Sequence, residues 1–123
     1  MFNLFKPKTP IWILNQETLD LIRSIEAVAA VHDLHVALGG SVLHKGQSFK
    51  DLDLYVYPHF SYNFTRHMLY DFACGLTSIG IKGWECRTEE QLSAYEIKRT
   101  FYTAYYEEKR IEFFIFSFPE EDL

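Results

Sequence analysis

The amino-acid sequence predicts an α+β domain in which helices pack on a mixed β-sheet. Two patterns in the 123 residues support this prediction. Apolar residues recur at helical spacing around residues 16–33 and 61–79, which indicates two amphipathic helices. Other stretches alternate apolar and polar residues, or are rich in aromatic and β-branched side chains, and both patterns are typical of strands. Helices and strands are interspersed along the chain, as expected when they form one domain.

An extended arm is expected at residues 1–14, because two prolines interrupt regular structure there. Trp12 and Leu14 can pin this arm to the rest of the domain. Asn15 is a residue type that caps helix N-termini, so the first helix is expected to begin directly after it and to span 16–33.

The middle of the chain predicts a strand, a turn and a second strand. A short strand is expected at 35–38, ended by a Gly-Gly pair and followed by one helical turn at 41–46. The second strand, at 51–57, alternates strictly and is ended by Pro58. Its residues divide into an apolar face and a polar and aromatic face, namely Leu52, Leu54 and Val56 against Asp51, Asp53, Tyr55 and Tyr57.

The second half of the chain completes the sheet. The helix at 61–79 ends at a glycine, and a strand at 81–86 follows it. A threonine followed by acidic and amide residues predicts a short helix at 88–96. Two stretches rich in aromatic and β-branched residues, 98–106 and 110–117, predict a hairpin.

Length and composition indicate one domain, residues 15–118, followed by an acidic tail at 119–123. A hydrophobic content of 48% supports a sizeable core, and a net charge of −5 disfavours an extended DNA-binding surface. Cys74 and Cys86 lack the spacing of a zinc site and are expected to be free thiols. No apolar run approaches the ~20 residues that span a membrane. We therefore expect a cytoplasmic protein without a membrane partner.

A glycine-rich turn is the first candidate for binding. Gly39 and Gly40 lack Cβ atoms, so a phosphate can approach their backbone, and the hydroxyl of Ser41 can donate to a phosphate oxygen. Lys45 and Lys50 lie in the segment that follows, and either can reach a phosphate. Taken alone, the turn is explained better as a tight turn with a capping serine, and the lysines as solvated loop residues.

Three carboxylates are the candidates for metal binding. Asp51 and Asp53 are two residues apart on a predicted strand, so their side chains share a face, where a divalent cation would relieve their repulsion. Glu112 is the acid inside an otherwise apolar last strand. If that strand lies beside the strand of the two aspartates, the three acids can hold two magnesium ions ~3.5–4 Å apart. The alternatives are a water-exposed polar face and a salt bridge from Glu112 to Arg110 or Lys98.

Together, these features resemble the minimal nucleotidyltransferases of the DNA polymerase β-like superfamily. The segment Leu38–Ser41 resembles the glycine element of that family, and Asp51–Asp53 follows after nine intervening residues as its carboxylate pair. Glu112 is assigned as the third, distal acid of the family motif. The resemblance covers residues ~16–117 in motif order and element order, and it implies the polymerase β-like core fold.

The resemblance also implies a reaction. Asp51, Asp53 and Glu112 would bind magnesium, and Gly40 and Ser41 would hold the phosphates of a nucleoside triphosphate such as ATP. A nucleoside monophosphate would pass to a hydroxyl on a protein or an RNA end, with release of pyrophosphate. Small relatives of this kind act in toxin–antitoxin systems, on a paired toxin protein or on transfer RNA. The alternative is an inactive module of the same fold that binds and regulates or inhibits a partner protein.

Overall fold

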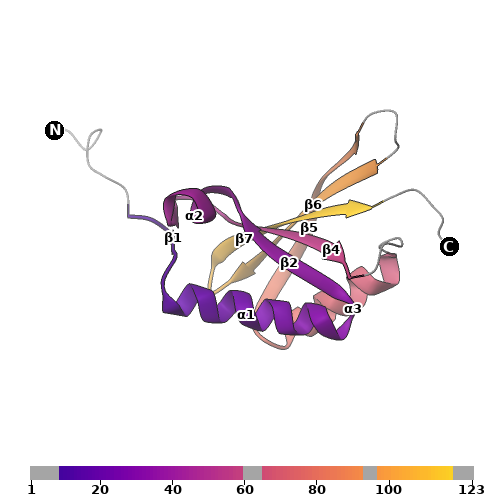
Figure 1. Ribbon diagram of the computed structural model, residues 1–123, viewed down its shortest axis with the longest axis horizontal. Coiled ribbons are helices and arrows are strands. Elements are labelled where there is room, and N and C mark those ends of the chain that lie inside the picture. The colour runs from indigo at the N-terminus through magenta and orange to yellow at the C-terminus, as the bar shows by residue number, and fades with distance from the viewer. Residues whose placement is uncertain (1–8, 60–64, 93–96, 118–123) are drawn as a thin grey trace.

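The computed structural model describes residues 9–59, 65–92 and 97–117. In this part of the chain, helices and strands are interspersed (Figure 1), which confirms the predicted α+β class. The elements, in chain order, are β1 (Trp12–Ile13), α1 (Gln16–Val31), β2 (Leu34–Gly39), α2 (Gly40–Lys45), β3 (Gln47–Ser48), β4 (Leu52–Pro58), α3 (Arg66–Thr77), β5 (Ile81–Leu92), β6 (Ile97–Tyr106) and β7 (Lys109–Ser117).

The main sheet has five strands in the order β2-β4-β7-β6-β5. The β4–β7 pair is parallel and the other pairs are antiparallel, so the sheet is mixed as predicted. A second, two-stranded sheet pairs β1 with β3. Because β4 and β7 are parallel neighbours, both strands begin at the same edge of the sheet, and this arrangement positions the candidate site.

The helices α1 and α3 cover one face of the main sheet and lie below it in the view of Figure 1. Their apolar residues pack on the apolar face of the central strands, and the fully buried side chains include Ile25, Phe72, Leu54 and Phe113. The alternation predicted for residues 51–57 is therefore correct. The opposite face of β4 carries Asp53 and Tyr55, which are half-buried.

The predicted first helix forms, and Asn15 is its N-cap, since the Asn15 side chain accepts a hydrogen bond from the backbone N–H of Thr18 at 3.0 Å. The helix ends at Val31, two residues before the predicted boundary. The second helix begins at Arg66 after the capping side chain of Thr65, later than predicted, and the beginning of the predicted range lies outside the described residues.

The predicted short helix at 88–96 is wrong as far as Leu92. These residues extend strand β5, which pairs antiparallel with β6 from Thr88 opposite Phe101 to Leu92 opposite Ile97. The local pattern of a threonine before acidic residues favours a cap, but the hydrogen bonds of a neighbouring strand override it. Residues 93–96 lie outside the described residues.

The predicted hairpin forms from β6 and β7, joined by Glu107 and Glu108. Both turn residues have positive φ angles, 50° and 66°, which suit the twist of a two-residue hairpin turn.

Trp12 anchors the N-terminal segment to the domain, as expected. Its side chain is 1% exposed, and its indole N–H donates to the backbone carbonyl of Arg110 at 2.9 Å. Leu14 is 37% exposed and does not share that role.

Cys74 and Cys86 are free and exposed, as predicted. Among the described residues, no helix is both long and apolar enough to cross a membrane.

Candidate functional site

The structure brings the three predicted carboxylates together. Asp53 in β4 lies directly opposite Glu112 in β7, because these two strands are parallel neighbours. Asp51 immediately precedes β4. One carboxylate oxygen from each of the three residues lies within 4.8 Å of the other two. The predicted proximity of Glu112 to the aspartates is therefore confirmed, and the three acids can hold a metal ion.

The carboxylates belong to a row of residues that crosses the sheet. Gly39 in β2 pairs with Asp53, and Thr103 in β6 pairs with Glu112. Directly opposite residues of neighbouring strands share a face, so this row places backbone, carboxylates and a hydroxyl side by side. Thr103 is 1% exposed, and its hydroxyl has no hydrogen-bond partner among the described residues. A buried hydroxyl beside the acids is a further polar group that sequence reasoning missed.

The two glycines make room for side chains of the neighbouring strand. A Cβ atom on Gly40 would collide with the carboxylate of Asp53, and Gly40 also has a φ of +65°. A Cβ atom on Gly39 would collide with the ring of Tyr55. The sequence analysis explained the glycines by the approach of a phosphate. In the structure their missing side chains first allow Asp53 and Tyr55 to lie against the turn.

Asp51 is held by two contacts. The hydroxyl of Ser48 accepts hydrogen bonds from the backbone N–H groups of Lys50 and Asp51, each at 3.1 Å, which shapes the loop before β4. The Arg110 guanidinium donates from Nε to the Asp51 carboxylate at 2.5 Å, and this bond raises the pKa of Arg110. Arg110 therefore pairs with Asp51, whereas the salt bridge considered from the sequence joined Arg110 to Glu112. Asp51 is only 8% exposed, so its charge depends on such a partner.

The surroundings of Asp53 raise the pKa of its carboxyl group. Burial, and then the nearby charges of Asp51 and Glu112, raise its pKa to about 6 from a usual value of 3.8, while Lys50 acts in the opposite direction. One oxygen of Asp53, Oδ1, is buried and has no hydrogen-bond partner among the described residues. A carboxylate that is both crowded by acids and incompletely hydrogen-bonded is a good ligand for a hard cation.

The residues predicted to bind phosphate lie at different places relative to the three carboxylates. Gly40 and Ser41 begin α2, and Ser41 is exposed to solvent. Lys50 is exposed and close enough to lower the pKa of Asp53. Lys45 lies in the last turn of α2 and is not among the groups that shift Asp53. Of the two predicted lysines, Lys50 is the one that the fold places beside the carboxylates.

Two histidines also meet, which the sequence analysis did not anticipate. The ring nitrogens His35 Nε2 and His59 Nδ1 are 2.5 Å apart, and His35 Nδ1 lies 3.1 Å from the Glu26 carboxylate. The antiparallel register of β2 with β4 creates this contact, since Leu34 lies opposite Pro58. Among the described residues, the group whose ligand atoms lie close enough for a metal ion is the carboxylate site, and these histidines do not form a second one.

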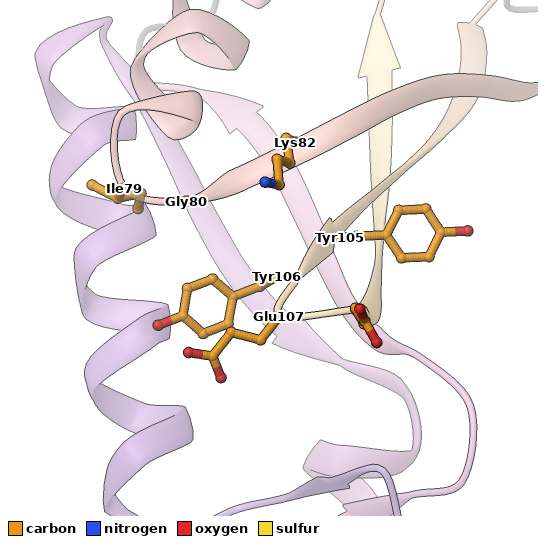
Figure 2. A pocket seen from close by; sticks show the side chains of 7 residues that line it. Ile79, Gly80, Lys82, Tyr105, Tyr106 and Glu107 are labelled. Atoms are coloured by element: carbon orange, nitrogen blue, oxygen red, sulfur yellow. The ribbon is translucent and has the colours of Figure 1, made fainter.

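A hollow of about 810 Å³ lies beside the β6–β7 turn. Figure 2 shows the rings of Tyr105 and Tyr106 pointing to different sides of β6, with Lys82 on the neighbouring strand. Asp53 and Glu112 do not line this hollow. The hollow is therefore separate from the carboxylate site. That site is recognised by its clustered charges and by the strand register that brings them together.

The features that define the site are thus the carboxylates of Asp51, Asp53 and Glu112, the glycine turn packed against Asp53, and the cations Lys50 and Arg110. The sequence predicted the three carboxylates, the glycine turn and Lys50 as candidates, but neither the packing of the turn against Asp53 nor the role of Arg110, which depends on the pairing of β7 with β4. No family model and no curated protein matches this chain.

Proposed function

We propose that the protein is a magnesium-dependent nucleotidyltransferase with a polymerase β-like core. It would move a nucleoside monophosphate from a nucleoside triphosphate to a hydroxyl group of a protein or RNA acceptor. The observation that carries the proposal is the convergence of three carboxylates within 4.8 Å: Asp53 and Glu112 lie on adjacent parallel strands, and Asp51 immediately precedes the first of them. The glycine turn beside Asp53 supports it, because it stands where the family resemblance requires a phosphate-binding element.

The three carboxylates fit a magnesium site by their chemistry. Magnesium prefers oxygen ligands, and carboxylates are its usual protein ligands. The buried Oδ1 atom of Asp53 has no other partner among the described residues. Asp51, Asp53 and Glu112 would hold the metal, with two ions proposed by resemblance. When bound, magnesium supplies neutralisation of phosphate charge and polarisation of the phosphorus–oxygen bonds.

The protein's own residues would bind and orient the reactants. Gly40 and Ser41 open the turn after β2, where the backbone N–H of the turn and the Ser41 hydroxyl can donate to phosphate oxygens. An acceptor hydroxyl oxygen would form a bond to the α-phosphorus while the bond from that phosphorus to pyrophosphate breaks. The Glu112 carboxylate would orient the hydroxyl and accept its proton. Positioning and charge neutralisation would supply most of the rate, as in other phosphoryl transfers.

A second candidate function is a binding module that keeps the fold without turnover. The contact that favours it is the bond from Arg110 to Asp51, which occupies one oxygen of a proposed metal ligand. In that case Arg110 neutralises Asp51 permanently, and the protein would regulate or inhibit a partner protein by contact. The two functions differ in whether a divalent cation competes successfully with Arg110 for Asp51.

The test is incubation of the purified protein with magnesium and each of the four ribonucleoside triphosphates in turn. Parallel mixtures contain the protein alone, host protein extract and total transfer RNA. Pyrophosphate release, together with a mass gain of one nucleotide on an acceptor, is the expected result. Asp53→Asn should abolish transfer, whereas Asp71→Asn, a surface acid on α3, should leave it unchanged. Nucleotide binding without pyrophosphate in any mixture would support the binding module instead.

A further inference from the structure

A small basic pocket adjoins the carboxylate site. It measures about 280 Å³ and is lined by three cationic side chains, Lys50, Lys109 and Arg110, together with one carboxylate, Glu108. The cations meet because β4 and β7 are parallel neighbours: Lys50 lies in the loop before β4, and the other two begin β7. Because Arg110 is already paired with Asp51, the remaining charges of the lining are those of Lys50, Lys109 and Glu108.

The lysines of this pocket are available to a ligand. Within the described part of the chain, neither Lys50 nor Lys109 forms an ion pair. The Lys109 ammonium lies over the ring of Trp12, 4.6 Å from its centre, which holds the stem of Lys109 in place. Trp12 in turn donates to the backbone of Arg110. Both lysines line the same pocket, so an anion bound there would find two ammonium groups without an ion-pair partner among the described residues.

The rest of the lining is apolar and aromatic. Ile11, Phe49 and Tyr105 are 43%, 48% and 37% exposed, although large apolar side chains are usually buried. A positively charged groove bordered by exposed rings is the combination that binds single-stranded nucleic acid, since the cations contact phosphates and the rings stack on bases. The volume is at the lower end of ligand pockets, so it suits about one nucleotide.

The pocket and the glycine turn lie on different sides of the aspartates. Gly40, the first residue of α2 directly after β2, lies against Asp53, whereas Arg110 in β7 contacts Asp51 on the other side of β4. A triphosphate held at the glycine turn would therefore leave the basic pocket open for the second reactant.

We propose that the basic pocket binds the terminal nucleotide of a single-stranded RNA, the acceptor in the reaction. Lys50 and Lys109 contact its phosphate, and Phe49 and Tyr105 contact its base. This inference rests on the proposed function only for the role of the RNA as acceptor. The binding of RNA to the pocket does not require nucleotide transfer. A contact of one nucleotide also agrees with the acidic composition, which disfavours a long phosphate-binding surface.

The test is fluorescence anisotropy with a short, fluorescein-labelled oligoadenylate, in EDTA and without any triphosphate. We expect a dissociation constant on the order of 10–100 μM at low salt. Because the two lysines neutralise one phosphate, the logarithm of the affinity should fall with the logarithm of salt with a slope of about −0.7. Inorganic phosphate should compete, and an oligoglutamate peptide should bind much more weakly than the RNA.

Variants assign the binding to the pocket. The double variant Lys50→Met, Lys109→Met should weaken RNA binding at least ~10-fold and flatten the salt slope. Phe49→Ala should weaken it about 5-fold or more through lost stacking. Arg23→Met, a change at an exposed arginine on α1 outside this pocket, is the matched control and should change affinity less than about 2-fold. Unchanged circular dichroism spectra should accompany each variant.

The outcomes separate this inference from the proposed function. RNA binding that survives in the double variant, or oligoglutamate binding as tight as that of RNA, would overturn the inference. Transfer of a nucleotide to a protein without measurable RNA binding would overturn it while leaving the transferase intact. RNA binding that depends on Lys50 and Lys109, in a protein that transfers nothing, would support the pocket and count against the transferase.

Discussion

Asp53 and Glu112 lie directly opposite each other in the parallel pair of strands β4 and β7. They are 59 positions apart in the sequence, yet their carboxylates share one face of the sheet with that of Asp51. The helices bury the opposite face of the same strands, so the sheet separates the apolar core from the acids.

Replacing one of the three carboxylates by an amide should weaken metal binding. In Asp53→Asn, the affinity for Mn²⁺ should fall by at least ~10-fold, because a neutral amide is a weaker ligand than a carboxylate. Glu112→Gln should act in the same direction. Asp71→Asn, a change at a surface acid on α3, should not alter the affinity. The measurement is electron paramagnetic resonance of free Mn²⁺, and equal binding by all variants would contradict the assignment of the site.

Stability without a divalent cation should fall as pH rises between about 4 and 6. The pKa of Asp53 is 3.8 in the unfolded chain and about 6 in the fold, so the native state binds more protons across this range. Ionisation of Asp53 therefore destabilises the fold, by about 1 kcal/mol after allowance for solvent screening. Urea unfolding of the wild type and of Asp53→Asn at pH 4 and pH 7 measures the effect.

In the same experiment, the variant should lose the part of the pH dependence that comes from Asp53, and at pH 7 it should be more stable than the wild type. Metal affinity should show the opposite trend in the wild type, rising with pH through about 6, because protons compete with the cation for Asp53. A wild-type stability that rises with pH relative to the variant would contradict the burial of an ionised Asp53.

Gly40→Ala should disturb the site more than a glycine substitution in open space. Gly40 combines a φ of +65° with a Cβ position that collides with the Asp53 carboxylate. We expect a loss of about 2 kcal/mol of unfolding free energy, with weaker Mn²⁺ binding. Gly46→Ala is the matched control, since Gly46 has a φ of +75° but no neighbour within 4 Å. The control should cost about 1 kcal/mol and leave Mn²⁺ binding unchanged.

Arg110→Met should leave the charge of Asp51 without its partner. Asp51 is 8% exposed, so the variant should lose about 2 kcal/mol of unfolding free energy. Magnesium should restore part of this loss, because a bound cation can replace the guanidinium. Arg23→Met, a change at an exposed residue of α1, should have little effect in the same urea titration. A loss in Arg110→Met that is insensitive to magnesium would favour the binding module over the transferase.

Local patterns were sufficient for most of the elements. The periodic apolar residues of α1, the alternation of β4 and the hairpin of β6 and β7 were all predictable, because each depends on neighbours in the sequence. Asn15 acts as the expected cap for the same reason. The failure at Thr88–Leu92 shows the limit, since the strand β6 that pairs with these residues imposes an extended conformation on a segment whose local signals favour a helix.

The groups that could form a site are readable from the amino-acid order alone: two aspartates at strand spacing, a glycine turn before them and an acid in a distant apolar strand. Three relationships between them require the folded chain: Glu112 lies opposite Asp53, Arg110 pairs with Asp51, and the Asp53 carboxylate occupies the space where a Cβ atom of residue 40 would lie. Side-chain type and spacing are local properties, so they can be read without the fold. Strand order and register depend on burying one apolar face beneath two helices, which the whole chain decides together.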